Sequence, residues 1–322
     1  MLHYFWYKMV LVQGRRRRRK YGLAVATLVA AGLAAVCAAA APAPLTPVAK
    51  VGIGAQAGMV LSAAGSVWST DLTLGRVVRI DPATNTVAHK TAFASRPFGL
   101  AYGAGSLWVA DRSLNVLGRI DPRTGKVLKR IRIGYETYGA TFAAGSVWVT
   151  SELDGTVRRI SPRKNKVTAT IKVGTTPNGV VYAFGSLWVA DLGRGKLVRI
   201  NVRTNKITKR ITVAKADWIT PSPDALWVSS ESGRVFRIDP ATGAVVAKVD
   251  VGANPLGSAW INGELWVPNI DDGTISIVDP AKNQVRSTLA AGAGPLSIAS
   301  AAGDVWISVS EAGQIWRVRP VQ

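Results

Sequence analysis

The sequence predicts an all-β protein: a seven-bladed β-propeller built from four-stranded antiparallel blades. A short phrase, in its commonest form G-S-[LV]-W-V, returns seven times, and its tryptophans lie 39 or 40 residues apart. Each interval holds four strand-like runs separated by turn residues, and none of the runs has helical spacing. Units of about 40 residues with four strands each are typical of propeller blades. The seven tryptophans are Trp68, Trp108, Trp148, Trp188, Trp227, Trp266 and Trp306.

The third unit shows the four strands in order. An apolar run at 138–142 is followed by a β-branched and aromatic run at 147–150, and alternating runs follow at 156–160 and 166–173. Glycine, proline, asparagine and aspartate stand between the runs, as expected for turns. We name these strands A to D, outward from the axis of the propeller.

Strand B carries the repeated tryptophan. A large flat side chain at the same place in every blade fills the space between neighbouring sheets, so we expect all seven tryptophans in the core. Aromatic residues also recur near the end of strand A, and we expect them in the core as well. They are Tyr102, Phe142, Tyr182 and Trp260.

Strand C ends in R-I-[DSN]-P, which we interpret as the chemistry of a tight turn between strands C and D. The last unit has strands A, B and C but no strand D. Residues 47–52 resemble the end of a strand D, and we expect them to complete the seventh blade and close the ring. The predicted domains are therefore a signal peptide with a short linker at 1–46 and the propeller at 47–322.

The first 46 residues have the pattern of an export signal. Arg15–Arg19 and Lys20 form a basic run, residues 21–41 are almost wholly apolar, and small residues precede Pro42. We expect a secreted, periplasmic or cell-envelope protein. A retained membrane anchor, lipidation at Cys37, the twin-arginine route and a true start at Met9 stay open as alternatives.

Positive charge is concentrated in one part of the ring. Residues 119–215 hold 20 Lys and Arg against five acids, and most of these basic residues fall in strands C and D and the turn between them. Two interpretations stay open: charged outer strands that prevent aggregation, or docking to an anionic polymer or membrane surface. We expect no nucleic-acid binding, because the protein is predicted to be exported and no ladder of aromatic residues accompanies the basic rim. A monomer is expected.

Residues that commonly carry catalysis are scarce. The two histidines are His3, in the leader, and His89, in an outer strand, and the single cysteine is Cys37. This inventory argues against a Ser-His-Asp triad and against histidine-ligated metals. No catalytic residue is predicted.

The loops between strands D and A provide the candidate ligand site. Their usual form is x-x-P-x-G, and two blades depart from it, at 135–139 and 215–219, with aromatic and acidic residues where a turn would suffice. Since these loops converge around the channel mouth, ligand contact is predicted there. The candidates are Tyr135, Glu136, Tyr138, Asp217 and Trp218, together with Arg96, Asn178 and Asn254 from the loops that keep the pattern.

Loops between strands B and C add carboxylates to the same face. Arg112, Glu152, Asp154 and Glu231 are among the charged residues at these positions. Rings of oxygen ligands hold Mg²⁺ or Ca²⁺, so Asp71, Asp111 and Asp191 are candidate metal ligands, although turn formation explains such residues as well.

Several repeated phrases resemble those of known propellers. Gly105–Asp111 reads G-S-L-W-V-A-D, residues 119–127 read R-I-D-P-R-T-G-K-V, and residues 171–174 read I-K-V-G. These phrases are similar to YVTN-type repeats and to the propellers of the virginiamycin B (streptogramin) lyase family. The resemblance covers residues 47–319. It implies a seven-bladed fold and, for the lyases, Mg²⁺-assisted elimination with a histidine base, for which this sequence has no channel-facing histidine.

Two functions are therefore expected. The first is an exported binding or scaffold module whose partner is a small ligand or an envelope protein. The alternative is a metal-dependent lyase or hydrolase with a base other than histidine.

Overall fold

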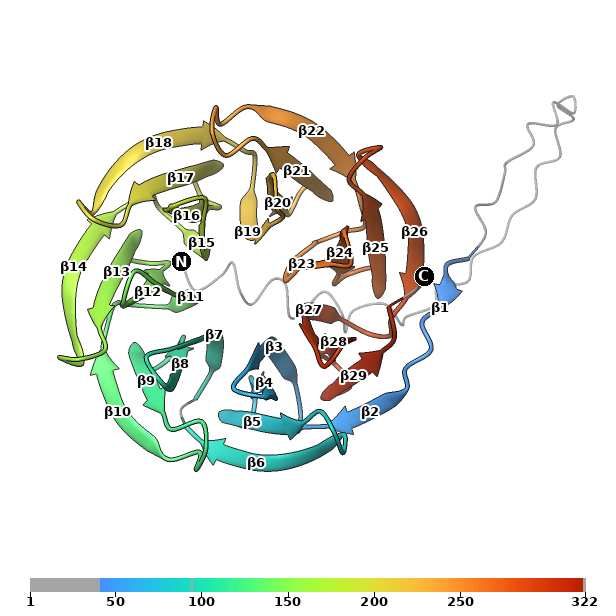
Figure 1. Ribbon diagram of the computed structural model, residues 1–322, viewed down its shortest axis with the longest axis horizontal. Helices are drawn as coiled ribbons and strands as arrows, with labels where there is room; N and C mark the ends of the chain where they lie inside the picture. Colours follow the sequence, from blue (N-terminus) through green and yellow to red (C-terminus); the bar gives the residue numbers. More distant parts are fainter. Residues whose placement is uncertain (1–40, 94, 321–322) are drawn as a thin grey trace, which may run out of the picture. The chain divides into compact units, whose positions relative to one another are not determined.

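Seven sheets, each with four antiparallel strands, surround a common axis, and one of them has a short fifth strand added in parallel at its outer edge (Figure 1). The computed structural model describes residues 41–93 and 95–320. In six sheets the strands follow the chain outward from the axis, and in the seventh the outermost strand comes from the N-terminal part of the described chain. The predicted fold class is confirmed.

Blades one to seven each have an innermost, a second, a third and an outermost strand, in that order from the axis. The innermost strands are β3 (Ala57–Ala63), β7 (Pro97–Gly103), β11 (Thr137–Ala143), β15 (Pro177–Ala183), β19 (Ala216–Pro221), β23 (Ala259–Ile261) and β27 (Pro295–Ala301). The second strands are β4 (Ser66–Asp71), β8 (Ser106–Asp111), β12 (Ser146–Ser151), β16 (Ser186–Asp191), β20 (Leu226–Ser230), β24 (Glu264–Asn269) and β28 (Asp304–Val309). The third strands are β5 (Arg76–Asp81), β9 (Val116–Ile120), β13 (Thr156–Ser161), β17 (Lys196–Asn201), β21 (Arg234–Ile238), β25 (Thr274–Asp279) and β29 (Gln314–Val318). The outermost strands are β6 (Thr86–Ala92), β10 (Val127–Arg132), β14 (Lys166–Lys172), β18 (Lys206–Thr212), β22 (Val245–Asp250), β26 (Gln284–Ala290) and β2 (Ala49–Gly52).

The repeated tryptophans lie in the core as expected. Each is at most 1% exposed, on the second strand of its blade. In several blades the indole nitrogen also donates a hydrogen bond to the carbonyl at the end of the first strand, as from Trp108 to Gly103 at 3.0 Å. The ring thus fills space between blades, and in those blades its polar atom is satisfied. The buried indole nitrogen of Trp227 has no hydrogen-bond partner among the described residues.

Of the aromatic residues near the end of strand A, Tyr102 and Tyr182 lie at the surface, which corrects the expectation, whereas Phe142 and Trp260 pack against core clusters. Tyr102 and Tyr182 are 39% and 40% exposed, and Phe142 and Trp260 are half-buried. At this register the side chain lies beside the A–B turn, at the face of the ring. Phe142 covers Gly103 of the neighbouring blade, where an added Cβ would lie 2.1 Å from the Phe142 ring.

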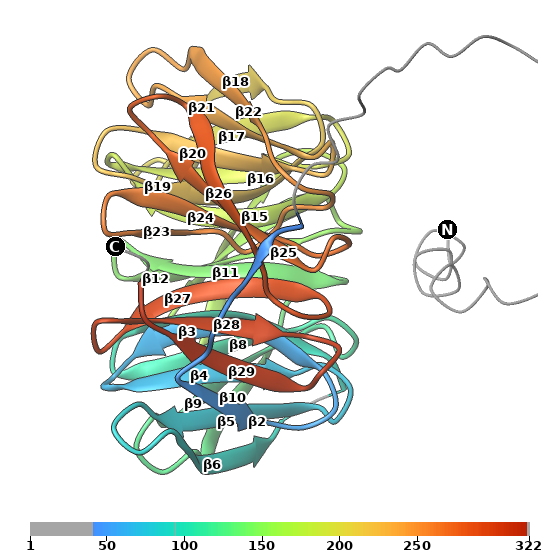
Figure 2. The same cartoon turned by 90° about the vertical axis from the view of Figure 1, so that its right-hand side faces the viewer.

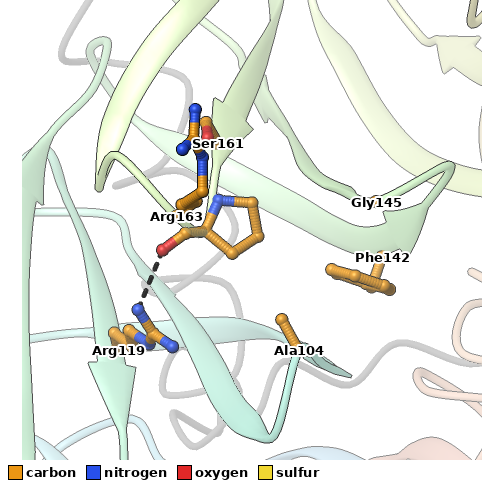
Figure 3. A pocket seen from close by; sticks show the side chains of 7 residues that line it. Ala104, Arg119, Phe142, Gly145, Ser161 and Arg163 are labelled. Atoms are coloured by element: carbon orange, nitrogen blue, oxygen red, sulfur yellow. Dashed lines mark hydrogen bonds between the residues drawn. The ribbon is translucent and has the colours of Figure 1, made fainter.

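Arginines on the third strands join successive blades. Arg119 pairs in register with Trp108, and its guanidinium carbon lies 5.2 Å from the centre of that ring. The same guanidinium donates to the carbonyl of Pro162 in the next blade at 2.9 Å (Figure 3). The arginine of R-I-D-P is therefore more than turn chemistry, because it clamps one blade to the next.

This arginine clamp recurs around most of the ring. Within the described residues it joins every pair of neighbouring blades except six and seven, where Ile277 pairs with Trp266. The clamping arginines are Arg79, Arg119, Arg159, Arg199, Arg237 and Arg317.

The ring is closed by the N-terminal strand, as predicted. β2 pairs antiparallel with β29, with Val51 opposite Ile315, and completes blade seven. A further strand, β1 (Ala43–Pro44), is not predicted by the sequence pattern and pairs parallel with β26 on the outside of blade six. Figure 2 shows this segment running along the outer side of the ring.

The predicted leader lies mostly outside the described residues. Among the residues that the structure describes, no helix is long and apolar enough to cross a membrane.

Candidate ligand site at the axial mouth

Two sets of loops meet at one face of the ring, as the sequence predicts. The residue after each second strand donates its backbone N–H to a D–A loop carbonyl of the same blade. Arg112 donates to Arg96 at 3.0 Å, and Glu152 donates to Glu136 at 2.9 Å. These bonds hold the B–C loop against the D–A loop, next to the axis.

A ring of seven side-chain positions lies where the first strands begin. Strand register makes these residues equivalent, because each follows the residue paired with the end of the second strand. The set is Gly58, Phe98, Tyr138, Asn178, Asp217, Leu256 and Leu296. Phe98, Tyr138, Leu256 and Leu296 belong to one apolar cluster with Met59, whereas Asn178 and Asp217 make the other side polar.

Blade five is shifted by one residue relative to the sequence motif. The backbone of Trp218 and Ile219 lies next to Gly179, because a Cβ added to that glycine would be 3.1 Å from Trp218 Cα and 3.4 Å from Ile219 N. Trp218 is therefore beside Gly179, and Asp217 is beside Asn178. Asp217, rather than Trp218, therefore occupies the axial position. Trp218 is half-buried against the axial apolar cluster.

A buried ion pair spans blades two and three at the mouth. Arg112 and Glu152 are bonded at 2.7 Å, and each side chain is 8% exposed. The Arg112 guanidinium carbon lies 4.7 Å from the centre of the Tyr138 ring and 5.4 Å from that of Phe98. The two rings are themselves 4.4 Å apart, so the arginine is held by an aromatic pair and a carboxylate.

Burial shifts the protonation of this group of residues. It raises the pKa of Glu152 to about 7, with Glu136 and Asp217 adding to the rise and Arg112 opposing it. Burial, together with Asp217, also raises the pKa of Tyr138 well above its usual range. Burial and the neighbouring Arg112 lower the pKa of Arg96. The mouth is thus a region where charged forms are costly, as is common at functional sites.

One hydrogen-bond acceptor in this group is unsatisfied. The Asn178 amide donates to Asp217 Oδ1 at 2.7 Å, and both residues are under 5% exposed. The other amide atom, Asn178 Oδ1, is buried and has no partner among the described residues. We call Arg112, Tyr138, Glu152, Asn178 and Asp217 the axial polar cluster.

The structure brings some predicted ligand residues together and leaves others apart. Tyr138, Asn178 and Asp217 lie in the axial ring, and Arg96 and Glu136 are on the loops beside it. Tyr135 is 63% exposed, and Asn254 donates to Asp271 at 3.2 Å on the other side of the mouth.

Arg112 and Glu152 were named by sequence only as loop charges. The sequence could have indicated this pair, because the two residues are 40 residues apart, which is one repeat, and carry opposite charges. Equivalent positions in successive blades face each other across a blade junction.

The three predicted metal ligands lie at the ends of second strands in separate blades. Asp111 accepts N–H bonds from Arg96 and Ser113, at 2.8 and 3.0 Å, and Asp191 accepts from Thr175 and Thr176 at 3.1 and 3.0 Å. Asp71 likewise accepts from Thr73 and Leu74. Each carboxylate ties loops of its own blade together, which is turn chemistry.

No shared metal-binding group is formed by these carboxylates. Among the described residues, no three His, Cys, Asp or Glu side chains come together as a metal would require. Binding of Mg²⁺ or Ca²⁺ therefore stays a prediction, and no catalytic step through a metal is derived.

The fold and this mouth define a class: a seven-bladed propeller with a half-apolar, half-polar axial face. Residues 152–306 match the model of a family described as "Repeat of unknown function (DUF6923)". No curated protein matches the sequence.

Solved structures are similar over most of the chain. A streptogramin B lyase structure has a TM-score of 0.74 and 17% identity, and the match covers 84% of this chain and 96% of that one. Hydrazine synthase from Kuenenia stuttgartiensis has a TM-score of 0.72 and 12% identity, covering 83% and 96%. At these identities the likeness shows the fold. The resemblance to streptogramin B lyase-like propellers is thus confirmed for the architecture.

Proposed function

We propose that this protein is an exported binding module of the cell envelope whose ligand contacts the axial polar cluster. The ligand is a small polar molecule that contacts the aromatic and acidic loops at the mouth. Because Asn178 Oδ1 is buried, the axial side chains must move apart before a hydrogen-bond donor of the ligand reaches it. Export rests on the predicted leader. The comparisons support the architecture on which this proposal is built.

The observation that carries the proposal is the buried polar half of the axial ring. Blades one, six and seven fill the same positions with Gly58, Leu256 and Leu296, so the fold does not need polar groups there. Burying an ion pair rarely improves stability over an apolar replacement, and an unsatisfied amide oxygen costs free energy. Such groups are expected where a ligand makes use of them.

A ligand screen by thermal shift on the full chain tests this proposal. Small polar molecules that raise the melting temperature should lose that effect in Asn178→Leu, which copies the leucine of blades six and seven. Asn262→Ala is the matched control, because it removes an amide from an A–B turn where four other blades carry alanine. Hits that stabilise Asn178→Leu and the control equally would contradict the site.

A second function is favoured by one observation, the raised pKa of Glu152. A carboxylate with a pKa of about 7 is suited to act as a general base near neutral pH. The alternative is therefore a lyase or hydrolase that resembles the streptogramin lyases in fold and uses Glu152 in place of histidine.

Turnover assays on cyclic esters and sugar lactones, with and without Mg²⁺, test the alternative. Activity should rise with pH through about 7 and disappear in Glu152→Gln. Glu231→Gln is the control, since Glu231 also follows a second strand. Activity that survives Glu152→Gln would remove Glu152 from the role of base.

A further inference from the structure

On the face opposite the axial mouth, blades two to four differ from the other blades at several turn positions at once. This face is formed by the A–B turns and the C–D turns. The repeat gives an internal comparison, because a residue that varies between equivalent turns is not required by the fold.

The C–D turns of blades two to four carry two extra basic residues each. The first position holds arginine in these blades and alanine in blades one, five and six; the second holds lysine in these blades and Thr86, Ala244 or Gln284 in the others. All six basic side chains are exposed. The pairs are Arg123 and Lys126, Arg163 and Lys166, and Arg203 and Lys206, against Ala83, Ala241 and Ala281.

Negative charge is removed from two of the same turns. In blades one, two, five and six an aspartate accepts the turn N–H groups, as Asp81 does from Ala83 at 2.8 Å. Blade four keeps this bond with neutral Asn201, which accepts from Arg203 at 2.9 Å. Blade three uses Ser161, which accepts from Lys164 at 3.3 Å. The hydrogen-bonded turn is therefore preserved in blades three and four, and what differs from the other blades is the missing negative charge of the aspartate.

Aromatic rings accompany the basic turns. Tyr102, Phe142 and Tyr182 stand at the end of the first strand in blades two, three and four, where blades one, five and seven have Ser62, Pro221 and Ser300. Blade six has the aromatic residue, Trp260, without the arginine. Rings and basic turns thus occur together in three consecutive blades.

One further ring is held in an unfavourable backbone conformation. Phe184 is 38% exposed, with φ of 50°, at an A–B turn position where Ala64, Ala104 and Ala144 occur. A bulky residue in the left-handed region is an outlier that costs stability and is found mainly at functional positions.

A groove brings one of these rings together with one of the basic turns. It lies between blades two and three, has a volume of about 470 Å³, and is lined by Phe142, Arg119 and Arg163 (Figure 3). An aromatic wall and guanidinium groups therefore share one concave surface.

We propose that this face of blades two to four binds an acidic polysaccharide. Arginine forks bind carboxylate and sulfate groups, and the flat aromatic side chains offer faces for sugar rings. One ring per blade, separated by charged turns, fits a chain of acidic sugars better than a run of stacked bases. The predicted export signal places the protein where such polymers occur. The surface lies opposite the axial mouth, so it does not depend on the ligand site proposed there, but it rests on the export that is part of the proposed function.

Binding of the full chain to polygalacturonate by calorimetry is the direct test, with neutral dextran as the uncharged comparison. The variant Arg123→Ala/Arg163→Ala/Arg203→Ala should bind at least about tenfold more weakly. This change copies the alanines of the other blades, so the fold is expected to persist. The control Lys90→Ala/Lys248→Ala/Lys282→Ala removes the same charge from exposed positions in blades one, five and six, and should bind as the unaltered protein does.

The double variant Tyr102→Ser/Tyr182→Ser tests the rings, and copies blades one and seven. It should weaken binding several-fold, and the loss should persist at high salt, where purely ionic contacts fade. Equal losses in the two charge variants, or no loss in the tyrosine variant, would overturn the proposal. So would tighter binding to single-stranded oligothymidylate or to phosphatidylglycerol vesicles than to polygalacturonate.

Discussion

Two tryptophans with different surroundings distinguish a structural residue from one that is predicted to contact a ligand. Trp188 is fully buried between blades, whereas Trp218 is half-buried at the axial mouth. Trp188→Ala is expected to lower the free energy of unfolding by about 3–5 kcal/mol, because it leaves a large cavity. Trp218→Ala should cost clearly less. Urea unfolding of both variants checks this, and equal losses would make Trp218 another packing residue.

Glu152 gives the stability of the protein a defined pH dependence. Its pKa is about 7 in the folded protein and close to 4.5 when unfolded, so the folded state holds this proton more tightly. Its contribution to stability is therefore fully present below pH 4.5 and declines as the pH rises through 7. The decline is about 3 kcal/mol, since a change of one in pKa corresponds to about 1.4 kcal/mol.

Comparison with Glu152→Gln between pH 5 and pH 8 isolates this effect. The stability of the unaltered protein relative to the variant should fall across that range in urea unfolding experiments. A relative stability that stays constant or rises with pH would show that the carboxyl does not hold a raised pKa.

At the scale of strands and turns, the closing strand is the element whose loss should matter most. β2 buries Val51, and the adjoining Ile53 is also buried in the core between blades seven and one. Deleting residues 47–53 should destabilise the ring by about 3–6 kcal/mol from these two side chains alone. A chain that lacks residues 1–41 is the control. An unchanged melting temperature after the deletion would contradict the closure.

The strands could be predicted because each is repeated. Seven copies of one pattern average out local exceptions, so strand order, tryptophan burial and ring closure all followed from periodicity. The exposed tyrosines were mispredicted because recurrence was taken for burial, whereas Tyr102 and Tyr182 recur on a surface.

The candidate site was only partly predictable, since its contacts run between repeats. Arg112 meets Glu152 across a blade junction, and Asp217 replaces Trp218 at the axis through a one-residue shift. Both depend on strand register, which the motif alone does not define.

For the whole molecule, the prediction to test is that the leader is cleaved on export. Cleavage after the small residues that precede Pro42 would leave both β1 and β2 in place. Mass spectrometry of the exported protein should find an N-terminus close to residue 42. Full-length chain confined to the membrane fraction would favour a retained anchor instead.

The segment from β1 to β2 has a mechanical consequence. Blade seven takes its outer strand from the N-terminal segment, so it has no C–D turn to offer a carbonyl, and the junction between blades six and seven has Ile277 where the others have a clamping arginine. The chain itself crosses this junction, with β1 on blade six, β2 on blade seven, and Leu45 buried between them. A tether at the N-terminus would load this seam first, peeling the two-residue β1 before any other strand. The ring would then open at the junction between blades six and seven.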